Sequence, residues 1–163
     1  MTNNHDRFGK TVERRTLVLG FSCLLVTSPH FAQAQDSTIW SAKDAHDALS
    51  DDLIRMIDVR SREEWEETGV ATGAWPISLH EDRFSVRLFA AKEVADGRPV
   101  ALICATGGRS GYVLRSLRQA GYDGFIDVSE GMMGSKRGPG WIAAGLPIVS
   151  SQDALNELPA ELA

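Results

Sequence analysis

Seven residues in the middle of the chain, Cys104-Ala105-Thr106-Gly107-Gly108-Arg109-Ser110, combine a thiol, two glycines and an arginine. A cysteine thiolate is a strong nucleophile. Gly107 and Gly108 permit backbone conformations that turn successive N–H groups toward one anion, and Arg109 adds a permanent cation with a forked donor for oxyanions. The segment therefore predicts a reactive Cys104 whose charge, or that of an adduct such as a persulfide, is stabilised by the backbone of residues 105–109.

Two plainer interpretations of these residues stay open. Cys104 could be an unreactive cysteine at the buried end of a strand. Arg109 could brace the loop by an ion pair with the region of Asp58 rather than bind a ligand.

The segments on either side of Cys104 predict how it is positioned. The apolar run Pro99–Ile103 predicts a buried strand that leads directly into the thiol, and Ser110 to Ala120 predicts the helix that follows. Cys104 would then lie above the positive end of a helix dipole, a position that favours the thiolate and binds anions.

Strand-like and helix-like segments alternate over the rest of the chain, which favours an α/β fold with a mainly parallel sheet flanked by helices. Strands are predicted at residues 38–40, 54–59, 74–79, 99–103 and 125–128, and helices at 42–49, 61–69, 82–95, 110–120 and 141–144. Ser41 and Ser61 are predicted to cap the first two helices, each with acidic residues in the first turn, and Gly69 to end the second. Residues 35–149 should form one domain, and the polar residues 150–163 a peripheral tail.

Residues 1–34 have the layout of an export signal. Arg14-Arg15 precede the ten-residue apolar run 17–26, and Ala32-Gln33-Ala34 offers a small-x-small cleavage site. Ten residues, at about 1.5 Å each, are too few to cross a bilayer core of about 30 Å, so no membrane span is expected after cleavage. We expect cleavage after Ala34 and a periplasmic or secreted product. The export route, general secretory or twin-arginine, stays open.

Charge and cysteine content narrow the function further. The net charge is −5, and residues 1–34 carry a net charge of +2, so their removal would leave −7. This balance argues against nucleic acid or an anionic membrane as a partner. Of the two cysteines, only Cys104 would remain, which excludes an internal disulfide and a self-contained dithiol oxidoreductase. His46 and His80 are isolated from other ligand-type residues, so neither a metal nor a cofactor is expected.

Three motifs, in this order along the chain, together resemble the rhodanese-like sulfurtransferases. Cys104-x-x-Gly107-x-Arg109-Ser110 is similar to the active-site loop of that family. Earlier in the chain, Asp58-Val59-Arg60, Glu64-Trp65 and Gly69-x-x-x-Gly73-Ala74 resemble its second motif, and Gly131, Trp141 and Gly145-Leu146-Pro147 resemble its closing motif. The similarity covers about residues 38–149. Val70 and Thr72 stand where the family has His and Pro, which should alter packing rather than chemistry.

The resemblance implies a five-stranded parallel sheet and a sulfur-carrying Cys104. A small sulfur-containing anion such as thiosulfate would donate sulfur, and a thiol, cyanide or a protein nucleophile would accept it. Asp58, Arg60 and Ser110 would support the loop. The stretch between Gly131 and Trp141 is longer than is usual in the family. Within it, Lys136 and Arg137 could attract the anionic donor or belong to a solvated turn.

Three other functions compete with sulfur transfer. A cysteine phosphatase or arsenate reductase also holds a thiolate in a loop that ends with arginine, but its loop has five residues between the two, whereas four separate Cys104 from Arg109. The shorter loop should be too tight for a tetrahedral phosphate or arsenate, yet large enough for one added sulfur atom. A non-catalytic binding module would not need Cys104. A thiol-based redox sensor would need a resolving thiol from another molecule.

Overall fold

The computed structural model of the chain describes residues 38–163, all of which belong to one compact unit. The export signal expected in residues 1–34 lies outside these described residues, so it stays a prediction. Among residues 38–163, no helix is both long enough and apolar enough to span a bilayer.

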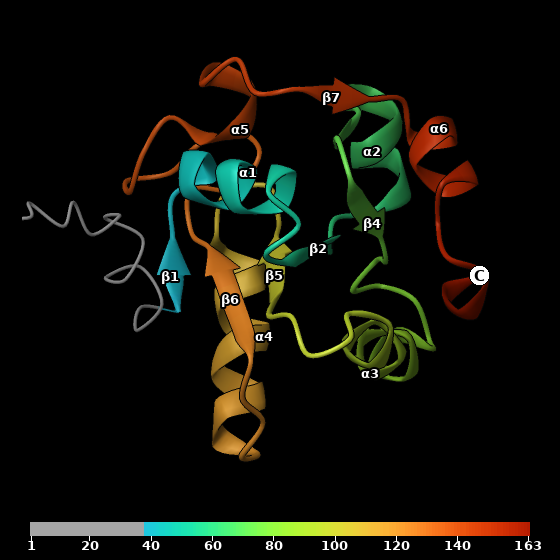
Figure 1. Cartoon of the computed structure of the whole chain (residues 1–163). Helices are drawn as coiled ribbons and strands as arrows, with labels where there is room; N and C mark the ends of the chain where they lie inside the picture. The colour runs from blue at the N-terminus through green and yellow to red at the C-terminus, as the bar shows by residue number, and fades with distance from the viewer. Residues whose placement is uncertain (1–37) are drawn as a thin grey trace, which may run out of the picture. The chain divides into compact units, whose positions relative to one another are not determined.

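Five parallel strands form the central sheet, as the sequence predicts (Figure 1). In spatial order they are β1 (Ile39–Trp40), β6 (Phe125–Val128), β5 (Val100–Ile103), β2 (Arg55–Asp58) and β4 (Ala74–Pro76). All four pairings are parallel, so the carboxyl ends of the strands share one edge. The strand that precedes Cys104 is the middle one and is buried throughout.

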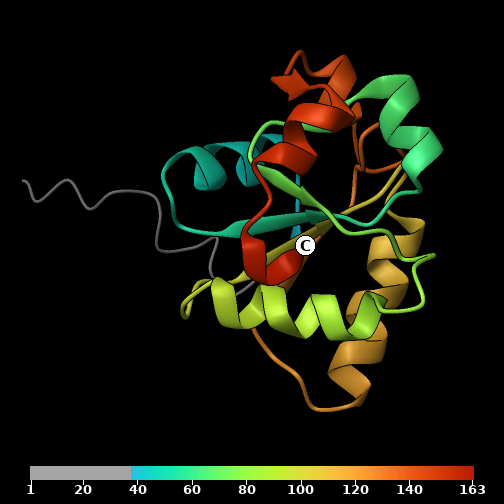
Figure 2. The ribbon, with the colours of Figure 1, turned by 90° about the vertical axis from the view of Figure 1, so that its right-hand side faces the viewer.

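Helices cover both faces of this sheet (Figure 2). On one face lie α1 (Ala42–Ser50) and α5 (Gly140–Ala143), and on the other α3 (Phe84–Val94) and α4 (Gly108–Gln119). Residues of β5 alternate between the two apolar clusters beneath these helices: Ala101 and Ile103 belong to the α1 side, and Leu102 and Cys104 to the α4 side. This alternation follows from the two-residue repeat of a strand, and it places the thiol under α4.

Two predicted helix starts are confirmed. Ser41 accepts a hydrogen bond from the Asp44 N–H at the start of α1. Ser61 and Glu64 form a reciprocal capping box at the start of α2 (Arg62–Thr68), and Gly69 ends that helix.

One helix start differs from the prediction. The helix expected from Ser110 begins two residues earlier, at Gly108, because Gly107 adopts the left-handed conformation that starts it. Arg109 therefore lies in the first turn of α4 rather than in the preceding loop.

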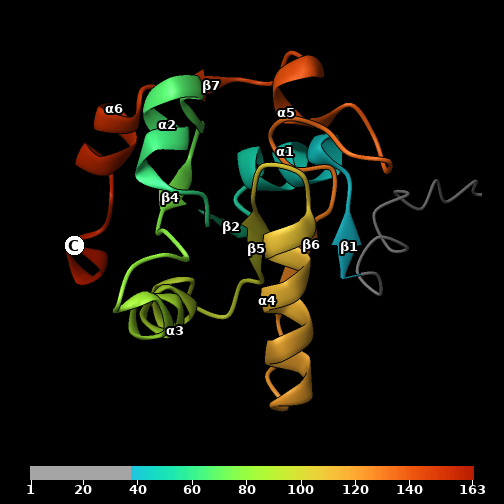
Figure 3. The ribbon, with the colours of Figure 1, turned by 180° about the vertical axis from the view of Figure 1, so that it is seen from behind.

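The carboxyl-terminal residues differ from the expected peripheral polar tail. They form β7 (Ile148–Val149), which pairs antiparallel with β3 (Val70–Ala71), then α6 (Ser151–Asn156) and a short 3-10 helix, Ala160–Leu162. Ala154 and Leu162 are buried, and the 3-10 helix packs against α3, beside which the chain ends (Figures 2 and 3). Two apolar residues spaced eight apart in a polar stretch are too weak a pattern to predict this packing.

Candidate active site

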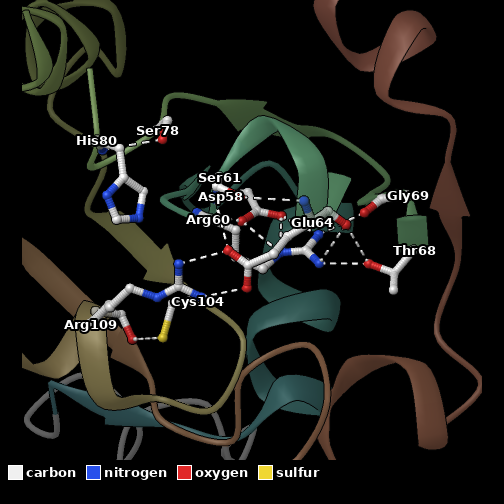
Figure 4. Close-up of polar contacts among 11 residues, drawn as sticks. Asp58, Arg60, Ser61, Glu64, Thr68, Gly69, Ser78, His80, Cys104 and Arg109 are labelled. Carbon is white, nitrogen blue, oxygen red and sulfur yellow. Dashed lines mark hydrogen bonds and ion pairs between the residues drawn. The ribbon is translucent and has the colours of Figure 1, made fainter. Parts of the chain in front are cut away.

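The thiol of Cys104 lies at the carboxyl end of β5 and is almost fully buried, with 1% of the residue exposed. Its side-chain contact comes from the first turn of α4, where the Ser110 hydroxyl donates to Sγ over 3.4 Å (Figure 4). A hydroxyl donor stabilises a thiolate more than a thiol, because the acceptor then carries a full negative charge.

The carbonyl groups at the start of the loop are bound on the side away from the helix. The N–H groups of Met132 and Met133 donate to the carbonyl oxygens of Cys104 and Ala105, each over 2.8 Å. Gly131 makes this close approach possible: its φ is +72°, and a Cβ atom there would overlap the backbone of Ala105. The same holds for Gly107 against the Ser129 carbonyl. Two glycines thus lock the loop against the segment that follows β6.

The backbone N–H groups of the loop differ from its first two carbonyl groups in their hydrogen bonding. No described residue accepts a hydrogen bond from the backbone N–H of any of residues 105–110. Several of these groups belong to the first turn of α4, where a helix always leaves N–H groups without internal partners. A loop whose first two carbonyls are engaged, and whose N–H groups have no acceptor among residues 38–163, is suited to an anion.

The sequence left open whether Arg109 forms an ion pair in the region of Asp58. Arg109 does form an ion pair, but with a different carboxylate. Its Nη1 and Nη2 donate to the two oxygens of Glu64 on α2, over 2.7 and 2.5 Å, rather than to Asp58 (Figure 4). This pair holds the pKa of Glu64 at about 2, below its usual 4.5, and raises the pKa of Arg109. Both side chains remain 30% exposed, so the pair lies at the surface of the site.

Asp58 and Arg60 form a buried network beside the loop, at the end of β2. Arg60 donates to both carboxylate oxygens of Asp58, and also to the Thr68 hydroxyl and the carbonyls of Glu64 and Gly69. The network ties both ends of α2 to the sheet. It therefore supports the loop indirectly, by positioning Glu64, which in turn holds Arg109.

Comparison with protein families agrees with this arrangement. The family model for the rhodanese-like domain matches residues 41–137, which is more than half of the chain. The chain belongs to the rhodanese-like domain family. The matched range contains every site residue predicted from the sequence, including Cys104 and Arg137.

Similarity to individual proteins is more limited. An uncharacterised protein of Synechocystis is 37% identical over 60 residues, which are 37% of this chain and 30% of that protein. The chain thus spans less than a third of this curated relative. Rv0390 of M. tuberculosis is 26% identical, with a TM-score of 0.49, over 69% of this chain and 97% of its own. A Rhodopseudomonas palustris protein described as a possible tyrosine phosphatase is 18% identical, with a TM-score of 0.48, over 71% and 87% of the two chains.

The long stretch before Trp141 turns back on itself in this rhodanese-like domain. Ser135 and Gly138 form an isolated bridge, and the Gly140 N–H donates to the buried carboxylate of Glu130. Lys136 and Arg137 lie at the exposed tip of this turn. Among the described residues, no hydrogen bond or ion pair joins either side chain to the loop of residues 104–110, so their role toward an anion stays a prediction.

The sequence singled out the thiol loop but missed two carboxylates near it. Glu64 was identified as part of the second family motif and as a first-turn residue, but its contact with Arg109 was missed, because nothing in a linear sequence pairs residues that are 45 positions apart. Asp127 was read only as part of a strand. An acidic residue inside the apolar strand Phe125–Val128 was the available signal, since an unpaired buried carboxylate is rare.

Within residues 38–163, neither histidine forms a side-chain hydrogen bond with a residue of the site. The His46 ring packs edge-on against Trp141, with 5.5 Å between ring centres, and His80 is exposed on the loop after β4. Within residues 38–163, no group of three or more His, Cys, Asp or Glu side chains could hold a metal ion.

Proposed function

We propose that this rhodanese-like domain is a sulfurtransferase that carries sulfane sulfur as a persulfide on Cys104. One observation carries the proposal: the only described cysteine opens a loop whose first two carbonyls are engaged elsewhere, while no described residue accepts a hydrogen bond from its N–H groups at 105–110. Such a loop stabilises a negative charge that remains on sulfur throughout the cycle.

The reaction would take two steps. The Cys104 thiolate attacks the outer sulfur of an anionic donor such as thiosulfate, forming a new S–S bond. The S–S bond of the donor breaks, and its electron pair leaves with sulfite. A nucleophile such as cyanide or a thiol then attacks the outer sulfur of the persulfide, and the electron pair of that S–S bond returns to Cys104 as thiolate. No external oxidant or reductant is needed.

The nucleophile's surroundings favour sulfur transfer over phosphoryl transfer. Four residues lie between Cys104 and Arg109, and the Arg109 guanidinium is already bound by both oxygens of Glu64. A phosphoryl group bonded to Cys104 would need that forked donor for its own oxygens. One added sulfur atom on Cys104 needs only the N–H groups of the loop.

Export to the periplasm or the exterior is part of the proposal, and it rests on the layout of residues 1–34 alone. In an oxidising compartment, an exposed thiol without a partner would be prone to oxidation. The burial of Cys104, 1% exposed, is compatible with a thiol that is kept for reaction there.

The test is the intact mass of the reduced protein after incubation with thiosulfate. We expect the wild type to gain one sulfur atom, which cyanide or a thiol then removes. Cys104→Ser is the matched control, because it keeps Cys23 in any unprocessed chain and changes one atom of the site. If a folded, reduced wild type gains no sulfur from thiosulfate or any other sulfane donor, the sulfurtransferase proposal is wrong and a binding or redox role is favoured.

A further inference from the structure

Asp127 is a buried acid that the proposed sulfur transfer does not use. It lies on β6 opposite Leu102 of β5, on the face of the sheet that α4 covers. Cys104 follows two residues after Leu102 and so points to the same face. Asp127 and Cys104 thus lie on neighbouring strands beneath the first turn of one helix.

That first turn is shaped to admit the carboxylate. A Cβ atom on Gly111 would lie 3.2 Å from Asp127 Oδ2, so a larger residue there would press on the acid. Ser110, the residue before Gly111, donates to Cys104 Sγ over 3.4 Å, and its hydroxyl also interacts with the Asp127 side chain. The Ser110 hydroxyl therefore bonds the thiol and is near enough to the carboxylate to lower its pKa.

The carboxylate has little else to stabilise its charge. Asp127 is 6% exposed, and its buried Oδ1 has no hydrogen-bond partner among the described residues. Burial raises its pKa, while the Ser110 hydroxyl and the charges of Arg137 and Arg115 oppose the rise. An unpaired buried carboxylate is costly when ionised, so it is a suitable place to hold a proton.

We propose that Asp127 is a positioning residue that, through Ser110, shares one negative charge with Cys104. The Ser110 hydroxyl has a single hydrogen to donate. When Asp127 is ionised, that hydrogen points to the carboxylate and Cys104 is a thiol. When Cys104 is a thiolate, Asp127 is protonated and donates to the Ser110 oxygen, and Ser110 donates to Sγ.

Passage between the two states conserves protons and charge. The S–H bond of Cys104 breaks and the O–H bond of Asp127 forms, with Ser110 giving up one hydrogen and receiving another. A buried thiol can thus ionise without placing a second negative charge beneath α4. The charged groups that act on the pair are Arg109 on the sulfur, and Arg115 and Arg137 on the carboxylate.

Two interacting acids titrate as a pair, in two steps that belong to neither alone. The experiment follows thiolate formation at Cys104 across acid to alkaline pH in the reduced full-length chain, by ultraviolet absorbance and by the alkylation rate with iodoacetamide. Every form compared, wild type included, carries Cys23→Ser, so that Cys104 is the one thiol detected. In wild type we expect two steps. In Asp127→Asn, whose amide stays neutral, we expect one step with its midpoint about one pH unit below the upper wild-type step, which is about tenfold more thiolate at intermediate pH.

Two kinds of variant test whether Asp127 acts on Cys104 through the Ser110 hydroxyl or only as a nearby negative charge. Ser110→Ala should reduce the effect of Asp127→Asn to about twofold, and Ser110→Thr, which keeps the hydroxyl, should restore it. Asp123→Asn, which removes an exposed acid just before β6, should leave the curve unchanged. The proposal is overturned if Asp127→Asn titrates like wild type, or if its shift is the same with and without the Ser110 hydroxyl.

A second measurement covers the case in which Asp127→Asn does not fold. The carboxyl signal of Asp127 can be titrated in wild type before and after Cys104 is alkylated. We expect alkylation to abolish the part of the Asp127 titration that coincides with the upper step, and an unchanged Asp127 curve would overturn the proposal. The inference concerns the thiol used in the proposed sulfur transfer, but these titrations use no sulfur donor, so failure to load sulfur and failure of the shared proton are separate outcomes.

Discussion

Two adjacent strands, β2 and β5, end at the same edge of the sheet, and each is followed by an arginine. After β2, the five N–H groups of the Arg60 guanidinium are directed to Asp58, Thr68, and the carbonyls of Glu64 and Gly69, and the residue is 1% exposed. After β5, Arg109 makes one forked ion pair and its side chain is 30% exposed.

The backbone differs between the two strand ends in the same way. Among the described residues, no acceptor is recorded for the N–H groups that follow Cys104, whereas the Arg60 N–H after β2 donates to Asp58. A fully satisfied polar network can gain nothing from a ligand, while an unsatisfied one can. The end of β2 therefore works as scaffold, and the end of β5 is where chemistry can take place.

The largest expected effect is a difference in the loss of unfolding free energy when each of the two arginines is replaced. Arg60→Ala leaves Asp58 buried with no cation, which we expect to cost about 3–5 kcal/mol of unfolding free energy. Arg109→Ala breaks a partly exposed pair and should cost about 1 kcal/mol or less. Denaturant unfolding of both variants at neutral pH measures the difference.

A further variant sharpens this comparison. Arg60→Lys keeps the charge but loses the planar fork, so it should fall between wild type and Arg60→Ala. Equal losses for Arg60→Ala and Arg109→Ala would mean that the two strand ends do not differ as scaffold and site.

The scaffold was largely predictable from the sequence because its signals are local. Apolar runs give β2 and β5, serine caps with acidic first turns give α1 and α2, and turn glycines give several of the boundaries. The helix at Ser151–Asn156 was missed because a single buried residue, Ala154, makes no periodic pattern. The order of the strands was not predicted, since alternation alone does not fix which strands are neighbours.

The site was predictable only where its residues are contiguous. Cys104 to Ser110 were found as one segment, whereas Glu64 and Asp127 reach it from other elements of the fold. Their roles depend on α2 lying beside the loop and on β6 pairing with β5 in one register. A one-residue slip in that pairing would turn Asp127 to the α1 face, so no inspection of the linear sequence could have placed it.

An intermediate effect should come from the Glu64–Arg109 pair, and it should depend on pH. Glu64→Gln keeps an acceptor for the Ser61 N–H but removes the charge that Arg109 binds. The pKa of Glu64 is about 2 in the folded chain, below its usual 4.5, so the carboxylate stabilises the fold above the unfolded value and loses that contribution as pH falls toward 2. Allowing for partial exposure, we expect Glu64→Gln to cost about 1 kcal/mol at neutral pH, as for the other partner of the pair.

The decisive measurement is how the difference in unfolding free energy between wild type and Glu64→Gln changes with pH. Urea unfolding of wild type and Glu64→Gln should give a constant difference above about pH 5 that narrows as pH falls from 4.5 toward 2. A difference that persists undiminished at low pH would show that Glu64 acts through packing rather than charge.

The smallest expected effect lies in the turn that carries Lys136 and Arg137. Both side chains are exposed, so replacing both with Ala should change the unfolding free energy by no more than about 0.5 kcal/mol. If they attract the donor, the apparent affinity for thiosulfate should fall about two- to threefold at low salt, and the difference should disappear at high salt because exposed charges are screened.

The control removes the same two residue types from elsewhere on the surface. Lys43→Ala with Arg118→Ala takes one lysine from α1 and one arginine from the far end of α4, both exposed. Equal losses of donor affinity in the two double variants would mean that only total charge matters. A loss confined to Lys136→Ala with Arg137→Ala would extend the anion-binding surface from the end of β5 to the turn after β6. An unchanged affinity would limit that surface to the loop of residues 104–110 and leave Lys136 and Arg137 as solvated side chains.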